Sequence, residues 1–303
     1  MIEQLEKLNS ALENTRLIQS TTSKKNVCFI VGLPRVGSTL LQQVLISRYN
    51  IGYVSNIIGK FWKNAVAGTI VHASLMQGEY LSNLNSEYGN TDGPFEPCEF
   101  GWFWKRVLKI NPENETIGNQ IDWPYLNDTL HGMAEVFQQP MVFDTPFVCG
   151  AISDIDTHID RVKVIHLTRN LKSIANSIFS ARISRYGSIK SYYGAKPKSW
   201  HEIKNFDDPI LQVVRQVHDL SKDIENELSL INPDHIFDLD ITELRKEPIK
   251  IADKIAEFLD VDASPQNLTL PRFRDRDNAP FFDEKYKQDF ESAWNTVFGA
   301  EAL

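Results

Sequence analysis

Residues 27–45, VCFIVGLPRVGSTLLQQVL, constrain the fold of this chain more than any other segment. An apolar run rich in β-branched residues leads into a loop bracketed by Gly32 and Gly37, and then into a stretch with helical spacing. A loop of this kind at the start of a helix directs several backbone N–H groups at one point, where the helix dipole adds about half a positive charge. The pattern predicts a buried strand, a phosphate-binding loop and a helix, which together form the first unit of an α/β fold.

Further apolar runs alternate with helical patterns along the chain. The runs that predict strands are residues 27–31, 141–143, 162–167 and 235–241. The stretches that predict helices are residues 171–182, 210–230 and 249–259, with another beginning near Glu284. This alternation is typical of a parallel sheet with right-handed crossover helices on both faces. We therefore predict an α/β fold, P-loop-like, with a central, mostly parallel sheet flanked by helices.

Residues 51–140 are the least regular part of the chain and are rich in Gly, Asn and aromatic residues. They are too long for an ordinary connection between sheet elements, and insertions of this kind commonly cap a site. Two shorter loop candidates, 197–209 and 271–280, lack the composition of interdomain linkers. We therefore assign 1–303 to a single domain, with an N-terminal packing helix in 1–22 and a long insertion after the first strand and helix that forms the substrate site.

Charge and composition exclude several classes of function. There are 40 acidic and 32 basic residues, and the resulting net charge of -8 argues against a nucleic-acid partner. No stretch approaches the roughly 18 apolar residues that span a bilayer, so we expect no transmembrane segment. The three cysteines, Cys28, Cys98 and Cys149, have neither the spacing of a metal site nor the even number of a disulfide framework. We expect a soluble, cytoplasmic protein in a reducing compartment.

The glycine loop departs from that of nucleoside triphosphatases at one position. In a Walker loop the second glycine is followed by a lysine that reaches the β- and γ-phosphates, whereas here it is followed by Ser38. The cation lies instead inside the loop, at Arg35, whose fixed fork of donors suits the oxygens of a transferring group. The loop therefore suits a leaving group different from that of a nucleoside triphosphatase.

The loop resembles the 5′-phosphosulfate-binding loop of sulfotransferases that use 3′-phosphoadenosine 5′-phosphosulfate, whose pattern is close to Pro-[Arg/Lys]-Ser-Gly-[Ser/Thr]-Thr-Leu. The residues that match are Pro34, Arg35, Gly37, Ser38, Thr39 and Leu40. Val36 stands where the family usually has Ser, which implies one side-chain contact to the nucleotide fewer. The resemblance implies that residues 34–40 bind this donor as co-substrate, that Arg35 stabilises the leaving phosphate, and that no metal is needed.

A donor with a 3′-phosphate requires a second anion site. The candidates are Arg169, directly after a predicted strand, and Ser177, eight positions later, which is the spacing of the family's 3′-phosphate motif. An arginine at the carboxyl end of a strand faces the crevice where open α/β sheets bind ligands. The family also closes its nucleotide site with a basic loop near the C-terminus, and Arg272, Arg274 and Arg276 are the comparable residues here. Their alternation with acidic residues equally fits a solvated, self-paired segment.

Transfer of a sulfuryl group to a hydroxyl needs a base that takes the acceptor's proton. Enzymes of this resemblance use a His or a Glu from the region after the phosphate loop, and residues 93–104, GPFEPCEFGWFW, resemble a stretch of bacterial members. Glu96 is the favoured base and Glu99 the second, because the aromatic residues around them raise a carboxylate's pKa by desolvation. Each also fits a surface or helix-capping carboxylate. His72 is a third candidate, for which a packing histidine is the simpler interpretation.

The sequence leaves the acceptor and the oligomeric state open. The net negative charge disfavours a highly sulfated glycan, and the aromatic-rich insertion favours the hydroxyl of an apolar alcohol, lipid or natural product, with an amine as the alternative acceptor group. The resulting prediction is a sulfotransferase that acts on a small molecule. Its alternatives are a P-loop small-molecule kinase, which would need the missing lysine and magnesium ligands, and a regulatory module that binds nucleotide without a competent base.

Overall fold

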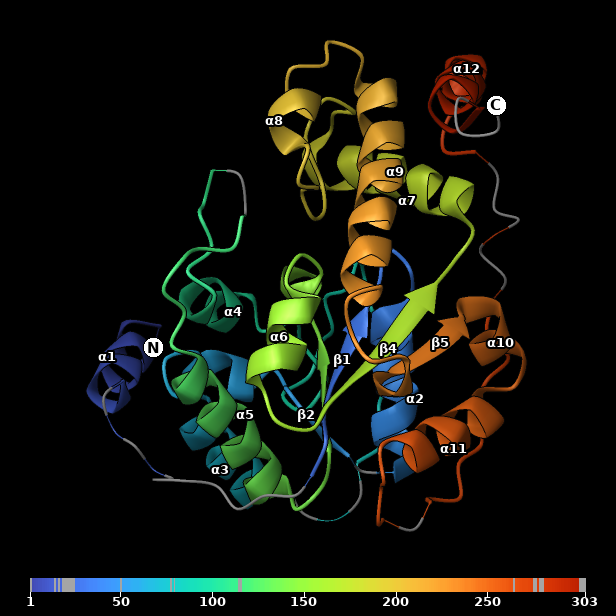
Figure 1. The fold of residues 1–303 in the computed structure, drawn as a ribbon. Helices are drawn as coiled ribbons and strands as arrows, with labels where there is room; N and C mark the ends of the chain where they lie inside the picture. Colours follow the sequence, from blue (N-terminus) through green and yellow to red (C-terminus); the bar gives the residue numbers. More distant parts are fainter. Residues whose placement is uncertain are drawn as a thin grey trace.

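The computed structural model of the chain describes residues 2–13, 15, 17, 25–49, 51–76, 78, 80–113, 116–263, 265–274, 277 and 281–299. Within these residues, parallel strands form a single five-stranded sheet in the order β2-β3-β1-β4-β5 (Figure 1). The strands are β1 (Val27–Val31), β2 (Gly52–Tyr53), β3 (Met141–Asp144), β4 (Val162–Thr168) and β5 (Ile236–Asp240). Because β1 pairs with β3 on one side and β4 on the other, the strand order reverses at β1, where open α/β sheets bind ligands.

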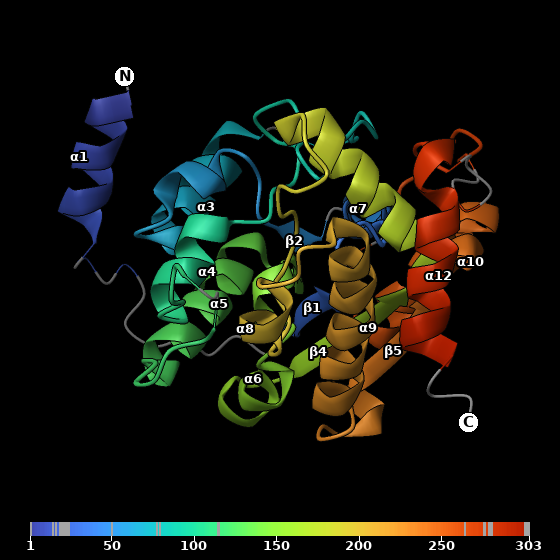
Figure 2. The ribbon, with the colours of Figure 1, turned by 90° about the horizontal axis from the view of Figure 1, so that it is seen from above.

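Helices cover both faces of this sheet, since successive side chains of each strand point to opposite sides (Figure 2). Phe29 of β1 belongs to the larger hydrophobic core. That core includes side chains of α4 (Gly101–Val107), α5 (Trp123–Phe137), α6 (Ile152–His158), α7 (Leu171–Tyr186), α9 (Pro209–Leu228) and α12 (Lys287–Phe298). Ile30 belongs to the smaller core, with α2 (Ser38–Tyr49), α10 (Ile241–Lys246) and α11 (Pro248–Phe258). The predicted single α/β domain with a parallel sheet is confirmed.

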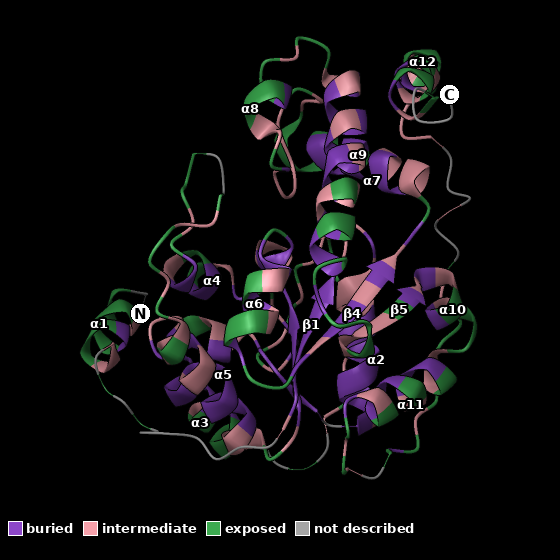
Figure 3. Ribbon diagram, viewed as in Figure 1, coloured by how far each residue is buried: buried purple, intermediate pink, exposed green. Residues whose placement is uncertain are grey.

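The predicted elements agree closely with the observed ones. The strands predicted at 141–143, 162–167 and 235–241 correspond to β3, β4 and β5. The helix predicted over 171–182 is α7, which continues to Tyr186 and ends at Gly187, whose φ of 69° suits a helix C-cap. The sheet is buried throughout its centre, where β1 has no exposed residue (Figure 3). Among the strands of the described residues, only β2 has no counterpart in the predictions, because two residues carry no periodic pattern.

Residues 51–140 are more regular than the sequence predicts. They contain the short 3-10 helix η1 (Ile58–Phe61), α3 (Ala65–Leu75), α4 and α5, so much of the insertion belongs to the core layers. The N-terminal helix α1 (Ile2–Leu12) lies at the edge of the molecule, where the Nδ2 atom of Asn64 donates to the carbonyl of Leu12 at 2.9 Å (Figure 1). The predicted helix in 1–22 is therefore present up to Leu12, and 18–22 lie outside the described residues.

The remaining helices are the 3-10 turns η2 (Pro146–Val148), η3 (Pro233–His235) and η4 (Glu284–Tyr286), and the short α8 (Trp200–Ile203). Across the described parts of the chain, none of the helices has both the length and the hydropathy of a membrane span. The cysteines Cys28, Cys98 and Cys149 are all free.

Candidate functional site

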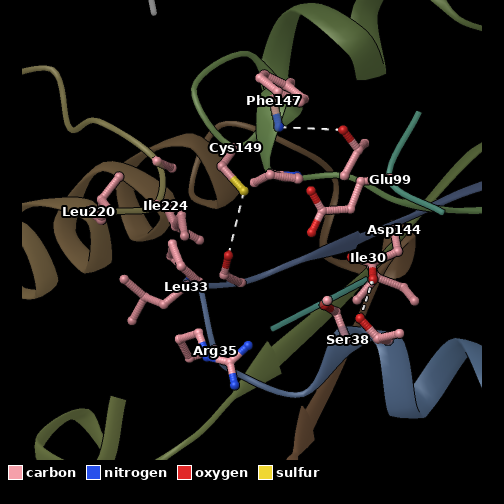
Figure 4. Close-up of a pocket in the computed structure, with 18 of the residues that line it drawn as sticks. Ile30, Leu33, Arg35, Ser38, Glu99, Asp144, Phe147, Cys149, Leu220 and Ile224 are labelled. Atoms are coloured by element: carbon pink, nitrogen blue, oxygen red, sulfur yellow. Dashed lines mark hydrogen bonds between the residues drawn. The ribbon is translucent and has the colours of Figure 1, made fainter. Parts of the chain in front are cut away.

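A cavity of about 1340 Å³ opens at the carboxyl edge of the sheet, where the phosphate loop, the end of β3 and the residue after β4 meet. Figure 4 shows Glu99 and Asp144 on one side of it, Leu220 and Ile224 on the other, and Arg35 below them. Its basic side chains are Arg35, Arg169, Arg185, Lys196, Lys198, Arg245, Arg272 and Arg274. They outnumber its acidic ones, Glu99, Asp144, Asp154 and Asp223. In a chain of net charge -8, this cavity concentrates positive potential where an anion would bind.

The two glycines of the phosphate loop are required by its geometry. A Cβ atom on Gly32 would lie 2.5 Å from the carbonyl oxygen of Leu167 in β4. Gly37 has a φ of 110°, and a Cβ there would lie 2.8 Å from Cδ1 of Ile241. The loop is thus pressed against β4 and α10, and α2 begins immediately after it, at Ser38. The predicted unit of strand, tight loop and helix is therefore present.

Most of the residues predicted to bind the donor through this loop line the cavity. These are Pro34, Arg35, Gly37, Ser38, Thr39 and Leu40. Val36 is an exception, because its side chain is buried in the smaller core with Ile241. The replacement of Ser by Val at this position therefore adds an apolar side chain to the core beneath the loop.

Arg35 is held from several directions. Its φ of 72° is left-handed, which is uncommon for a non-glycine residue and marks local strain. Its Nε atom donates to the hydroxyl of Ser177 on α7 at 3.1 Å, and its guanidinium lies 4.9 Å from the centre of the Tyr88 ring. Its carbonyl oxygen accepts a hydrogen bond from Nη1 of Arg169 at 2.9 Å. The cation of the loop is therefore fixed in place by β4 and α7.

Arg169 follows β4, lines the cavity and is mostly buried. The sequence predicts that Ser177 joins it in one anion site, but the structure pairs Ser177 with Arg35 instead, and Ser177 does not line the cavity. The physical reason is helical geometry. Because Ser177 lies two turns into α7, its hydroxyl reaches back to the phosphate loop rather than to the end of β4.

The C-terminal basic stretch reaches the same cavity. Arg272 and Arg274 line it, and both side chains are exposed. Arg276 lies outside the described residues. The structure therefore brings two of the three predicted arginines to the cavity that also holds Arg169 and Arg245.

Glu99 is the predicted base that reaches the cavity. The next residue, Phe100, has a left-handed φ of 55° and stacks on Phe103 with ring centres 4.6 Å apart. This constrained turn at the start of α4 sets the direction of the chain at Glu99. The carboxyl group is open to the cavity, yet the walls of this recess limit its hydration. That desolvation, reinforced by the charge of Asp144, raises the pKa of Glu99 to about 7.

Asp144, at the end of β3, is the second carboxyl group in the cavity. The hydroxyl of Thr39 donates to its Oδ2 atom at 3.3 Å. Burial raises the pKa of Asp144 to about 6, although hydrogen bonds from Ser38 and Thr39 act in the opposite direction. Asp144 is not among the site residues predicted from the sequence. Its position at the carboxyl end of a predicted strand is the same signal that identified Arg169.

Glu96, the favoured base, does not line the cavity. It is 1% exposed and accepts hydrogen bonds from the side chains of Gln43, Tyr80 and Ser82 and from the backbone of Asn83, all between 2.7 and 2.9 Å. A carboxylate satisfied in this way organises the loop around it and has no open path to a substrate.

His72 is a packing histidine. It is fully buried in α3, and its Nδ1 atom lies 2.8 Å from the hydroxyl of Ser55. Aromatic rings surround it, with Tyr53 and Phe95 in edge contact, and desolvation lowers its pKa to about 4. It does not line the cavity. Of the three candidate bases, the structure brings only Glu99 to the site.

Two further basic residues of the cavity, Arg185 and Arg245, are not among the residues predicted from the sequence. Arg185, on α7, stacks on the rings of Tyr88 and Tyr193, with its guanidinium 5.3 and 5.8 Å from their centres. Arg245, in the last turn of α10, donates from Nη1 to Asp277 at 2.9 Å. Neither arginine lies in a recognisable sequence motif. Each reaches the cavity only because of how its helix packs in the fold, which the local sequence does not reveal. Within the described residues, no group of three or more His, Cys, Asp or Glu side chains is arranged to hold a metal ion.

A family profile described as "Sulfotransferase family" matches residues 28–265, which is well over half of the chain. The chain belongs to the sulfotransferase family. This match includes the phosphate loop, Glu99, Asp144, Arg169 and Arg245, and it ends before the C-terminal basic stretch.

Solved sulfotransferase structures resemble this one at low sequence identity. Sulfotransferase STF1 from Mycobacterium tuberculosis H37Rv has a TM-score of 0.52 at 12% identity, over 86% of this chain and 72% of that one. The sulfotransferase domain of the curacin biosynthetic pathway has a TM-score of 0.46 at 14% identity, over 91% of each chain. That of the Synechococcus PCC 7002 olefin synthase has a TM-score of 0.44 at 14% identity, over 95% of this chain and 99% of that one. No curated protein matches the chain.

Proposed function

We propose that this sulfotransferase moves a sulfuryl group from 3′-phosphoadenosine 5′-phosphosulfate to the hydroxyl of a small, largely apolar molecule. The observation that carries the proposal is the relationship between Arg35 and Arg169. The two arginines come from motifs far apart in the sequence, line one cavity and are joined by a hydrogen bond of 2.9 Å. One nucleotide with an anionic group at each end fits such a pair of cations.

The phosphate loop would bind the 5′ end of the donor. The loop and the first residues of α2 line the cavity, where the N-terminal end of the helix would attract an anion, and Arg35 adds a positive charge. Arg169 would bind the 3′-phosphate. Membership of the sulfotransferase family supports this donor over a nucleoside triphosphate, and the loop has Ser38 where a kinase would have its lysine.

The transfer is an in-line displacement at sulfur. The acceptor oxygen forms a bond to sulfur while the bond between sulfur and the bridging oxygen of the 5′-phosphate breaks. The electron pair of that bond leaves with the product 3′,5′-ADP, and the hydroxyl proton passes to Glu99. Arg35 and the loop N–H groups stabilise the charge that develops on the leaving phosphate, an effect worth several kcal/mol in a preorganised site. With a pKa of about 7, roughly half of the Glu99 carboxyl groups are deprotonated and able to accept a proton at neutral pH.

The acceptor would enter along the apolar wall of the cavity. Leu220 and Ile224 line this wall, opposite Glu99 and Asp144, and Phe147 lies at the top of the view (Figure 4). Trp123 and Ile121, both from the insertion 51–140, also line the cavity. An apolar body against this wall would place its hydroxyl toward Glu99, so we propose that part of the insertion shapes the acceptor site.

Binding of 3′,5′-ADP and of ATP with magnesium to the wild type and to Arg35→Ala and Arg169→Ala, measured by calorimetry, tests the donor assignment. We expect 3′,5′-ADP to bind more tightly than ATP, and each variant to lose at least about tenfold in affinity for it. Unchanged affinity in both variants contradicts the proposal. Preference for ATP with magnesium, together with turnover of ATP, would indicate a kinase. Tight binding of 3′,5′-ADP without transfer to any acceptor in a broad screen would indicate a regulatory module.

The acceptor side is tested by Phe147→Ala. We expect the KM for apolar alcohols to rise about tenfold while the affinity for 3′,5′-ADP stays unchanged, because we assign the Phe147 ring to the acceptor part of the cavity. Trp102→Ala is the matched control, since Trp102 is 70% exposed on α4 and does not line the cavity. Equal effects of the two substitutions would mean that Phe147 does not contact the acceptor.

A further inference from the structure

The carboxylate of Asp277 lies between two arginines of the cavity. Its Oδ1 atom accepts from Nε of Arg169 at 2.5 Å, and its Oδ2 atom accepts from Nη1 of Arg245 at 2.9 Å. The side chains of Arg169, Arg245 and Asp277 are only 6%, 10% and 15% exposed. One carboxylate thus bridges two largely buried guanidinium groups that arise from different strand ends, Arg169 after β4 and Arg245 in the helix after β5.

This arrangement has the chemistry of an oxyanion site. Buried guanidinium groups need an anionic partner, because removing a charge from water without one is costly. The two guanidinium groups carry two positive charges between them, whereas the carboxylate of Asp277 carries one negative charge and two oxygens. A phosphate monoester near neutral pH carries close to two negative charges and offers three terminal oxygens to such donors. A phosphate therefore matches this pair of arginines better than the carboxylate does.

The Asp277 side chain can leave this position without detaching the segment that carries it. The backbone carbonyl of Asp277 accepts a hydrogen bond from the hydroxyl of Ser173 on α7 at 3.1 Å. Farther along the chain, the side chain of Asn176 accepts from the backbone N–H of Phe282 at 2.7 Å. Both hydrogen bonds are made by main-chain atoms, so rotation of the short Asp277 side chain leaves them in place and moves its carboxylate away from Arg169 and Arg245.

We infer that Arg245 is a ligand of the donor's 3′-phosphate alongside Arg169, and that Asp277 is an internal carboxylate that occupies this subsite until the nucleotide displaces it. The inference rests on the proposed function, because it assumes a donor with a 3′-phosphate. The inference adds Arg245 as a residue that binds the donor, and Asp277 as a side chain that competes with the 3′-phosphate for the two arginines. The nucleotide must displace a bound carboxylate, so its apparent affinity is lower than the intrinsic affinity of the two arginines.

Two nucleotides that differ only in the 3′-phosphate, 3′,5′-ADP and 5′-AMP, separate effects on the 3′-phosphate subsite from effects on the rest of the nucleotide site. We would measure binding of 3′,5′-ADP and of 5′-AMP by calorimetry to the wild type, Asp277→Asn, Arg245→Gln and Asp283→Asn. Asp283 is the matched control, because it lies in the same C-terminal segment but pairs with Lys285 and does not line the cavity. Thermal unfolding of each variant establishes that it is folded at the temperature of the titration.

Asp277→Asn should bind 3′,5′-ADP about three- to tenfold more tightly than the wild type, because the competing charge is removed. Arg245→Gln should bind 3′,5′-ADP about tenfold more weakly, with 5′-AMP changed less than about twofold in both variants. Asp283→Asn should match the wild type for both nucleotides. If Asp277→Asn leaves the affinity for 3′,5′-ADP unchanged or lowers it, Asp277 is not a competitor and this inference is wrong. If the wild type itself fails to distinguish the two nucleotides, the proposed donor is wrong.

Discussion

The Nε atom of Arg35 donates to the hydroxyl of Ser177 at 3.1 Å, across 142 positions of sequence. The loop that would bind the transferring group is thereby tied to α7, the helix that follows β4. Arg169 adds a second tie, because its guanidinium donates to the carbonyl of Arg35. Both the side chain and the main chain of Arg35 are therefore positioned by the β4–α7 unit, and the cation is held in place before any ligand arrives.

This relationship predicts energetic coupling between Arg35 and Ser177. Arg35→Ala should lower kcat/KM by about 10²- to 10³-fold, as expected for the loss of a charge aimed at the leaving group. Ser177→Ala should lower it by about three- to tenfold, because Arg35 loses one of its supports. In the double variant, Ser177→Ala should cause no further loss of kcat/KM beyond that of Arg35→Ala, since Ser177 acts only through Arg35. Steady-state kinetics on the four proteins measures this coupling.

Ser180→Ala is the control for this cycle, because Ser180 lies on the exposed side of the same helix. It should leave kcat/KM within about twofold of the wild type. Independent, additive losses at Arg35 and Ser177 would show that Ser177 contacts the nucleotide directly, as the sequence motif alone suggests.

The two neighbouring glutamates should respond differently to the same substitution. Glu99→Gln should lower kcat by about 10²- to 10⁴-fold, the usual contribution of a general base, with the affinity for 3′,5′-ADP unchanged. Glu96→Gln should instead lower the stability of the fold by about 2 kcal/mol, because Glu96 is buried and accepts several hydrogen bonds. Turnover per folded molecule and thermal unfolding separate the two outcomes. Full activity in Glu99→Gln would exclude it as the base.

The sequence predicts the anion-binding side of this site because its signals are local. The two glycines, Arg35 and Arg169 each lie at the end of an apolar strand, and parallel strands bring their carboxyl ends to one edge. Asp144 ends β3 in the same way, so the same reasoning extends to it. The insertion gives a weaker signal, because α3 has few polar positions to mark a helical period.

The choice between Glu96 and Glu99 was not predictable from the sequence. Both lie among aromatic residues, and the surroundings that separate them come from far along the chain. Glu96 is enclosed by Gln43 of α2 and by the loop that carries Tyr80, whereas Glu99 faces Asp144 and Arg185. The pairing of Arg245 with Asp277 depends in the same way on tertiary packing.

The pH dependence of turnover should follow the protonation of Glu99. Desolvation, together with the charge of Asp144, raises the pKa of Glu99 to about 7, and only the deprotonated form accepts a proton. We therefore expect kcat/KM to rise with pH through about 7 and to level off above it, since this profile reports the free enzyme.

Two variants should shift the rising, acidic limb of this pH profile of kcat/KM in opposite directions. Asp144→Asn removes a negative charge that raises the pKa of Glu99, so the limb should shift to lower pH. Arg185→Gln removes a positive charge that lowers it, so the limb should shift to higher pH. His72→Gln should leave the limb where it is, because His72 is buried outside the cavity. A limb that moves in His72→Gln and stays fixed in the other two would assign the base to His72.

The conformation of the phosphate loop predicts that adding one methyl group destabilises the fold at Gly37 but not at Gly299. At Gly37, a φ of 110° disfavours any L side chain, and the added Cβ would lie 2.8 Å from Cδ1 of Ile241. Gly37→Ala should therefore lower the free energy of unfolding by about 1–3 kcal/mol and weaken the binding of 3′,5′-ADP, because the loop N–H groups move. Gly299→Ala is the control, since nothing lies within 4 Å of a Cβ there and its φ is -71°. Denaturant unfolding and calorimetry measure both quantities, and a stable Gly37→Ala variant with wild-type nucleotide affinity would mean that the loop does not hold this conformation.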